Sequence, residues 1–286
     1  MRGFTMGRPF DIPKSPPVAE QNGDTYSSLV AIMRRLLEPD GCPWDREQDY
    51  RSLRRYVLEE ACEVIDAIDA ADMKQLEEEL GDLALQVVFL GELARREGKF
   101  GPDDVVRGIV EKLVRRHPHV FGDATVQSSD EVLRNWEQIK ASEKRERGVL
   151  DGVPRSLPAL QRAQRMGEKV SRVGFDWPDS RGSRDKVSEE IRELDEAIAA
   201  KDPARIESEL GDLLFALVNL ARHEGVDAET ALRGTADRFA RRFAHVEKRV
   251  KERHGGWPLG EDGKPAPGLP LDELDGYWNE AKREGA

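Results

Sequence analysis

Apolar side chains recur at helical spacing along most of the chain, and they nowhere alternate for long with the period of a β-strand. The first amphipathic segment runs from Tyr26 to about Leu37 and stops at Pro39 and Gly41. Further helices are expected over about 50–70, after residue 72, over 103–117, after residue 202 and over 228–253. The pattern predicts an all-α fold.

Capping signals mark where the long helices begin. Asp72 and Gln75 have the spacing of a capping box, and Asp202-Pro203 supplies an N-cap followed by Pro at the first helical position. The segment Cys42-Pro43-Trp44-Asp45 is expected to be a loop, in which Trp44 either anchors the fold or offers a surface for a base.

One pair of blocks occurs twice. E-E-x-x-E at 59–63 and E-L-G-D at 79–82 recur 130 residues later, at 189–193 and 209–212. Of the 32 positions from 59 to 90, 15 are identical to their counterparts, including all five acids. A single acidic pair on a helix is usually a solvated face, but this repetition favours a function.

The spacing of the acids predicts a cluster. Acids three residues apart share one helix face, so two antiparallel helices bring together Glu60, Glu63, Glu79 and Asp82, and their counterparts in the second copy. An apolar stripe beside Glu79 and Asp82 places these acids at the border of the core; it comprises Leu76, Leu80, Leu83, Val87, Leu90 and Ala94. Such charges need a proton, a partner or a metal, and all-oxygen ligands favour Mg²⁺ or Mn²⁺ over zinc.

Length and repeat predict two domains. We expect a flexible arm over 1–24, a first helical repeat over 25–147, a Gly- and Pro-rich linker over 148–158, and a second repeat over 159–286. Each repeat should end in a helix that carries a tryptophan, Trp136 or Trp278, and 255–270 should be a loop. Apolar side chains that one repeat leaves uncovered are expected to pair with another hairpin, either the other repeat of the same chain or a second chain; they include Leu85, Val88, Phe89, Phe215 and Val218.

Composition narrows the classes of partner. The chain has 56 acidic and 45 basic residues and a net charge of -11, which argues against general nucleic-acid binding. Two cysteines, Cys42 and Cys62, suit a reducing cytoplasm, and neither a membrane-spanning run nor a signal peptide is expected. His117-Pro118-His119 lacks a third nitrogen or sulfur ligand nearby, which favours a structural role.

Basic residues follow each acidic hairpin at matching positions, offset by 126: Lys112, Arg115 and Arg116, then Arg238, Arg241 and Arg242. They suit a metal-bound polyphosphate, although a solvated face explains any one of them. A di-iron bundle is disfavoured, because it needs Glu-x-x-His and the third-residue partners here are acids.

Together these motifs resemble the MazG family of nucleoside triphosphate pyrophosphohydrolases in its tandem form. The motifs that carry the resemblance are the doubled acidic blocks and the segments 41–45, 115–121 and 173–177. The resemblance covers about residues 26–283, apart from 255–270. It implies helical bundles that form a homodimer and a magnesium requirement. It also implies hydrolysis of nucleoside triphosphates to monophosphate and pyrophosphate, for which stacking on Trp278 favours loose base selectivity. A catalytically inactive dimerisation scaffold is the alternative.

The resemblance also assigns roles to residues. The implied magnesium ligands are Glu190, Glu193, Glu209 and Asp212, with Glu60, Glu63, Glu79 and Asp82 as first-repeat counterparts. The implied nucleotide contacts are Lys186, Glu189, Arg205, Arg238, Arg241, Arg242 and Trp278. Glu189 or Glu59 is expected to orient or deprotonate the attacking water. The resemblance favours the second repeat as the working one. Ala236 and Arg238 stand where the family usually has Asn and Lys, which keeps the first repeat as an alternative.

Overall fold

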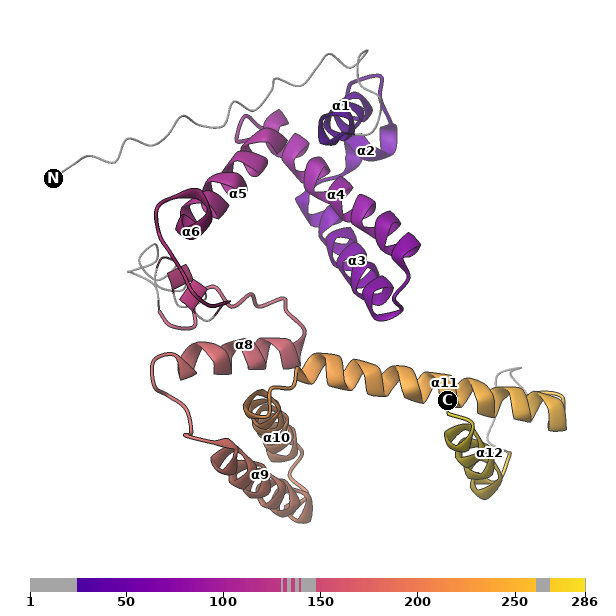
Figure 1. Cartoon of the computed structure of the whole chain (residues 1–286). Helices are drawn as coiled ribbons and strands as arrows, with labels where there is room; N and C mark the ends of the chain where they lie inside the picture. The colour runs from indigo at the N-terminus through magenta and orange to yellow at the C-terminus, as the bar shows by residue number, and fades with distance from the viewer. Residues whose placement is uncertain are drawn as a thin grey trace. The chain divides into compact units, whose positions relative to one another are not determined.

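The computed structural model describes residues 25–129, 131–132, 135–136, 139, 148–260 and 268–285. Within these ranges the fold is built from α-helices, which confirms the predicted fold class. The chain divides into two compact units, Met1–Arg145 and Glu146–Ala286 (Figure 1). The predicted arm over 1–24 lies outside the described residues. None of the described helices is long and apolar enough to cross a membrane.

The first unit is organised around a hairpin of two long helices, α3 and α4. Helix α1 packs against α4, while α5 follows α4 and leads into α6. The bounds are α1 (Tyr26–Leu36), α2 (Pro43–Glu47), α3 (Tyr50–Asp69), α4 (Met73–Arg96), α5 (Pro102–Arg116) and α6 (Pro118–Phe121).

The second unit repeats the hairpin with α9 and α10. Helix α8 packs against α10 and α11, and α12 packs against α11, which extends away from the hairpin (Figure 1). The bounds are α8 (Ala159–Ser171), α9 (Ser180–Ala200), α10 (Pro203–His223), α11 (Ala228–His254) and α12 (Leu271–Arg283).

Both hairpins start their second helix with an aspartate cap, as predicted. The carboxylate of Asp72 accepts hydrogen bonds from the Lys74 and Gln75 amides, and that of Asp202 accepts one from Arg205. The reciprocal half of the predicted capping box is not formed. The side-chain amide of Gln75 lies instead 3.5 Å from Glu79, one turn further along α4.

The loop predicted at 42–45 is wrong, because Pro43 begins the short helix α2. Proline fixes φ near the helical value and needs no hydrogen bond at the first helical position, so this proline starts a helix instead of breaking one. Trp44 is half exposed, and its ring meets that of Tyr56 edge-on at 6.0 Å between centroids. This contact favours an anchoring role for Trp44.

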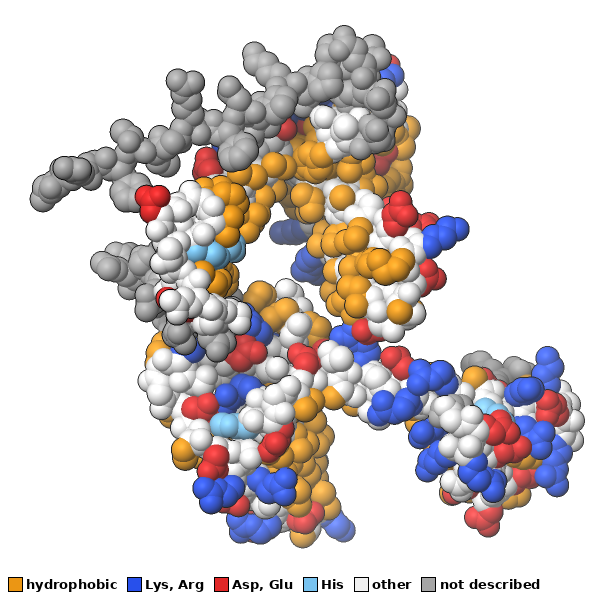
Figure 2. Space-filling model, viewed as in Figure 1, with side chains coloured by type: hydrophobic (Ala, Val, Ile, Leu, Met, Phe, Trp, Pro, Cys, Tyr) orange, Lys and Arg blue, Asp and Glu red, His pale blue; other side chains and the backbone are white. Residues whose placement is uncertain are grey.

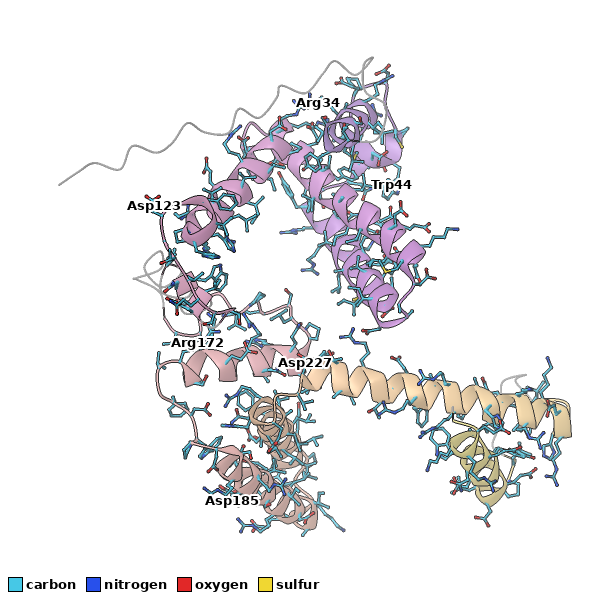
Figure 3. The ribbon with its side chains drawn as sticks, viewed as in Figure 1. Arg34, Trp44, Asp123, Arg172, Asp185 and Asp227 are labelled. Atoms are coloured by element: carbon cyan, nitrogen blue, oxygen red, sulfur yellow. The ribbon has the colours of Figure 1, made fainter. Side chains whose placement is uncertain are left out.

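The core of the first unit lies between α1 and α4. Met33 packs with Val88 and Phe89, and all three are buried. Arg34 of α1, labelled in Figure 3, places Nη2 3.0 Å from Oε1 of the fully buried Glu92, and Nε of Arg95 lies 2.6 Å from that carboxylate. The buried charge is therefore compensated.

The prediction that Val88 and Phe89 stay uncovered is wrong, because α1 covers that face of α4. In the second unit Val218 is buried too, whereas Phe215 is exposed as expected. The stripe predicted beside the acids is covered only in part: Leu80 and Val87 are 50% and 41% exposed, whereas Ala94 is 0% exposed. Leu90 packs against the core.

Each hairpin therefore carries an open apolar face beside its acids. The exposed apolar side chains are Leu58, Ile65, Ile68, Leu80 and Val87 on α3–α4, and Ile191, Ile198, Leu210, Leu214, Phe215 and Leu217 on α9–α10. Figure 2 shows hydrophobic side chains gathered along each hairpin. A single helix packed on one side of a two-helix hairpin leaves the other side uncovered.

Two adjacent residues of α1 test the placement of the core. Met33 is 1% exposed and Ile32 is 53% exposed. We expect Met33→Ala to lower the free energy of unfolding by about 2–5 kcal/mol, because it removes buried atoms and leaves a cavity. Ile32→Ala should change it by about 0.5 kcal/mol or less. Urea unfolding followed by circular dichroism measures both, and equal losses would contradict the assigned helix face.

Candidate metal and nucleotide site

The first acidic cluster lies between α3 and α4. One carboxylate oxygen from each of Glu60, Glu63 and Glu79 lies within 4.8 Å of the others. Burial raises the pKa of Glu60, and the charges of Asp82 and Glu63 raise it further. The fourth predicted ligand, Asp82, is thus close enough to act on Glu60 through its charge. Proximity of like charges makes this cluster receptive to a cation.

The second cluster has the same architecture. Carboxylate oxygens of Glu190 and Glu193 from α9 and Glu209 from α10 lie within 4.8 Å of one another. Glu190 is buried, whereas its two neighbours are partly buried. Asp212, one turn after Glu209, is exposed and lies outside this group of three. Three of the four predicted ligands in each repeat therefore converge.

Two cations offset part of the negative charge of the second cluster. Lys186 Nζ lies 2.7 Å from Glu190 Oε1 and 2.9 Å from Glu189 Oε1. These hydrogen bonds, to Glu190 first, raise the pKa of Lys186, and Lys186 in turn lowers the pKa of Glu189. Arg205 Nε lies 3.4 Å from Glu209 Oε1. The predicted contacts Lys186, Glu189 and Arg205 thus lie at the acidic cluster that is predicted to bind the metal.

The first cluster lacks both cations. Positions 130 residues before Lys186 and Arg205 hold Tyr56 and Gln75, neither of which is charged. The raised pKa of Glu60 has its cause in this uncompensated charge as well as in burial. Sequence reasoning missed the difference, although aligning the repeats at the offset of 130 shows it.

The other predicted nucleotide contacts form a second group along α11 and α12. Arg238 donates to Thr235 Oγ1 at 2.8 Å, and Arg238 and Arg241 are exposed. The Arg242 guanidinium lies 5.8 Å from the centre of the Trp278 ring. The structure therefore places the implied contacts in two groups, one on the acidic hairpin and one on α11–α12 (Figure 1).

The segment 173–177 forms part of a pocket of about 490 Å³ in the second unit. Asp176 accepts hydrogen bonds from Arg222 Nη2 at 2.6 Å and pairs with His223 Nε2 at 3.0 Å; the Arg222 hydrogen bond is the main cause that lowers the pKa of Asp176. A Cβ atom on Gly182 would collide with the Trp177 ring, so glycine allows Trp177 to lie on the start of α9. The pocket lining includes Val170, Phe175, Trp177, Phe215 and Arg222.

Fold and site together define a duplicated all-α protein that carries one carboxylate cluster on each helical hairpin. The profile of the MazG nucleotide pyrophosphohydrolase domain matches residues 48–121 and 182–247, which contain both clusters. The chain belongs to the MazG family, as the sequence resemblance implies.

Relatives match almost end to end. The chain is 46% identical over 262 residues to a nucleoside triphosphate pyrophosphohydrolase of Escherichia coli (strain K12), covering 90% of this chain and 96% of the relative. It is 43% identical over 265 residues to the nucleoside triphosphate pyrophosphohydrolase/pyrophosphatase MazG of Thermotoga maritima, covering 92% and 98%. Both repeats are therefore shared with these relatives.

Charge repulsion in the first cluster can be tested without metal. We expect Glu60→Gln to stabilise the protein in EDTA at neutral pH. A raised pKa means that the folded state binds the proton more tightly, so wild-type stability falls as pH rises from the ordinary carboxyl pKa through the raised one. The variant should show a shallower fall in urea unfolding.

Glu97 is the matched control, since the hydrogen bond with Lys99 lowers its pKa. Glu97→Gln should therefore remove stability above the ordinary carboxyl pKa, the opposite sign. Identical pH profiles for Glu60→Gln and wild type would contradict the repulsion.

Proposed function

We propose that this protein hydrolyses nucleoside triphosphates to nucleoside monophosphates and pyrophosphate, and that the second repeat is the working site. The names of the relatives from E. coli and T. maritima support the reaction. The observation that carries the choice of repeat is the pair Lys186 and Arg205 beside the buried cluster, where the first repeat has Tyr56 and Gln75. A triphosphate brings negative charge to carboxylates, and Lys186 and Arg205 are cations in place at the second cluster to offset that charge.

The donor set fits magnesium. Converging carboxylate oxygens without imidazole or thiolate are the ligands that Mg²⁺ and Mn²⁺ prefer, and the residues that would hold the ion are Glu190, Glu193 and Glu209. Asp212, one turn after Glu209, is the fourth ligand that we propose. When bound, the ion neutralises phosphate oxygens and lowers the pKa of a coordinated water.

The protein's own groups supply the remaining chemistry. Glu189, kept ionised by Lys186, accepts a proton from the water that attacks the α-phosphorus. The bond from that phosphorus to the bridging oxygen breaks, and pyrophosphate leaves. Arg238, Arg241 and Arg242 stabilise its charge, and Trp278 stacks on the base with little selectivity. Location in the cytoplasm and absence of a nucleic-acid partner remain predictions from composition.

Isotopic labelling tests the reaction. The purified protein is incubated with ATP and Mg²⁺ in water enriched in oxygen-18, and the masses of the products are measured by mass spectrometry. Attack at the α-phosphorus should place the label in the monophosphate. Label in pyrophosphate, or orthophosphate as first product, contradicts the assignment, and no Mg²⁺-dependent turnover of any nucleotide would favour the inactive scaffold.

Matched double variants test which repeat works. We expect Glu190→Gln with Glu193→Gln to lower kcat by about 100-fold or more, because the charge that holds the metal is lost. The equivalent change at Glu60 and Glu63 should leave kcat within about 2-fold, since Tyr56 and Gln75 stand there in place of Lys186 and Arg205. The reverse pattern would move the working site to the first repeat, and two active variants would contradict the mechanism.

We also propose that the active form is a homodimer. The open apolar faces beside the acids need a cover, and the arginine and tryptophan group lies on helices that leave the hairpin (Figure 1). Pairing of two copies can bury the faces and bring α11–α12 of one copy to the acids of the other, with two-fold symmetry.

Substitution on the open face tests the pairing. Leu210→Glu should shift the protein to monomer in sedimentation velocity and lower specific activity at least about 10-fold, because a buried unpaired charge disfavours association. Leu259→Glu, on an exposed loop residue, should leave both unchanged. A wild-type monomer with full specific activity on dilution would rule out an intermolecular site.

A further inference from the structure

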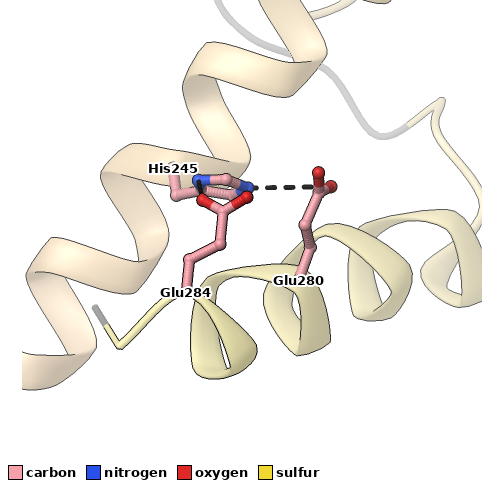
Figure 4. A group of neighbouring side chains, drawn as sticks. All are labelled: His245, Glu280 and Glu284. Atoms are coloured by element: carbon pink, nitrogen blue, oxygen red, sulfur yellow. Dashed lines mark ion pairs between the residues drawn. The ribbon is translucent and has the colours of Figure 1, made fainter.

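A third group of possible metal ligands lies between α11 and α12, and it differs from the two acidic clusters. His245 of α11 lies between Glu280 and Glu284 of α12, with one ring nitrogen toward each carboxylate (Figure 4). One ligand atom from each of the three residues lies within 4.8 Å of the others. The set combines one imidazole nitrogen with two carboxylate oxygens.

Ordinary hydrogen bonding does not account for this arrangement. His245 Nε2 is 3.7 Å from Glu280 Oε2, and Nδ1 is 3.5 Å from Glu284 Oε2. Hydrogen bonds from nitrogen to oxygen span about 2.7–3.2 Å. Nε2 is buried and has no hydrogen-bond partner among the described residues. A buried ring nitrogen that faces a carboxylate across too wide a gap calls for a further partner.

An imidazole binds a metal ion through one of its two ring nitrogens, and one such nitrogen lies within 4.8 Å of an oxygen of each glutamate. Nitrogen and oxygen ligands lie about 2.0–2.2 Å from zinc, so neighbouring ligands of a tetrahedral ion are about 3.4 Å apart. We propose that His245, Glu280 and Glu284 bind a divalent transition-metal ion of the zinc class. Imidazole favours zinc, cobalt and nickel over magnesium, which separates this site from the all-oxygen clusters.

A neighbouring arginine supports the carboxylate that faces the buried nitrogen. Arg249 Nε lies 3.2 Å from Glu280 Oε2, and its guanidinium also pairs with Glu252. The contact with Glu280 is an ion pair, since Arg249 Nε, like His245 Nε2, has no hydrogen-bond partner among the described residues. Arg249 also offsets part of the charge of the two glutamates. Three protein ligands leave a position for water.

The ion would join two helices that are far apart in sequence. The apolar core of the seam between α11 and α12 consists of Val246, Val250 and Tyr277. Trp278 lies on α12 two residues before Glu280, and its ring contacts that of Phe239 on α11 at 5.0 Å between centroids. Metal binding at the seam would therefore fix the helix that carries Trp278 and raise the thermal stability of the protein.

Zinc titration of the full chain tests the site. Calorimetry is run with Mg²⁺ in large excess, so that the all-oxygen clusters are saturated. Wild type should bind one zinc ion, and His245→Gln should bind it about 100-fold more weakly or lose it, because a coordinating nitrogen is gone. The double variant Glu190→Gln with Glu193→Gln should keep the zinc ion. Cobalt(II) should show ligand-field bands in wild type that are lost in His245→Gln.

Control variants distinguish the loss of a zinc ligand from a general disturbance of the α11–α12 interface. His254 lies in the same seam and is paired with Glu273 at 2.8 Å, so His254→Gln should keep the zinc ion. Glu284 ends α12 with its side chain 60% exposed, so Glu284→Gln should weaken binding without disturbing packing. Zinc binding that is unchanged in His245→Gln and Glu284→Gln, or that is lost only in the Glu190 and Glu193 variant, would overturn the proposal.

Discussion

Repulsion between carboxylates held within 4.8 Å of one another is the constraint around which each unit is built. The acids do not hold the hairpins together, since like charges in a partly buried place oppose folding. Stability has to come from elsewhere, namely from the aspartate caps and from the helix packed on the second helix of each hairpin. In the first unit α1 supplies that helix through Met33, and in the second unit α8 does so.

The two repeats share this backbone and differ in how they balance its charge. Lys186 and Arg205 contact the second cluster, and uncharged residues occupy their positions in the first. Outside the acidic clusters, one pair of equivalent positions carries opposite charges. The buried Glu92 of the first repeat corresponds to Arg222 in the second. Glu92 is paired with Arg34, and Arg222 is paired with Asp176. Each repeat has kept its own charges compensated at this position while the signs have changed.

The exposed apolar face of each hairpin links the acidic cluster to association with a partner. A hairpin of two amphipathic helices exposes more apolar surface than one further helix can cover. The residues left open lie next to the acids, so a partner that covers them also changes the dielectric environment of the carboxylates. Burial of the face and tuning of the site are for this reason physically linked.

Much of this protein follows from the sequence by itself. Helical periodicity, the caps at Asp72 and Asp202, and the three-residue spacing of the acids depend on neighbours within one or two turns, so helix starts and the shared face of the acids could be predicted. The MazG resemblance rests on equally local motifs. Two local predictions were wrong. Gln75 does not complete the capping box, because Glu79 is an alternative partner for its side chain. Residues 42–45 do not form a loop, because Pro43 suits a helix start as well as a turn.

Only the tertiary structure decided which side of each helix is covered. Val87 and Val88 are both apolar, and burial of the second depends on where α1 packs, which periodicity within α4 does not specify. The approach of His245 to Glu280 and Glu284 likewise depends on how α12 returns to α11 across the residues between them. Burial and long-range pairing are set by the free energy of the whole packed unit, whereas the pattern along one helix records only its local geometry.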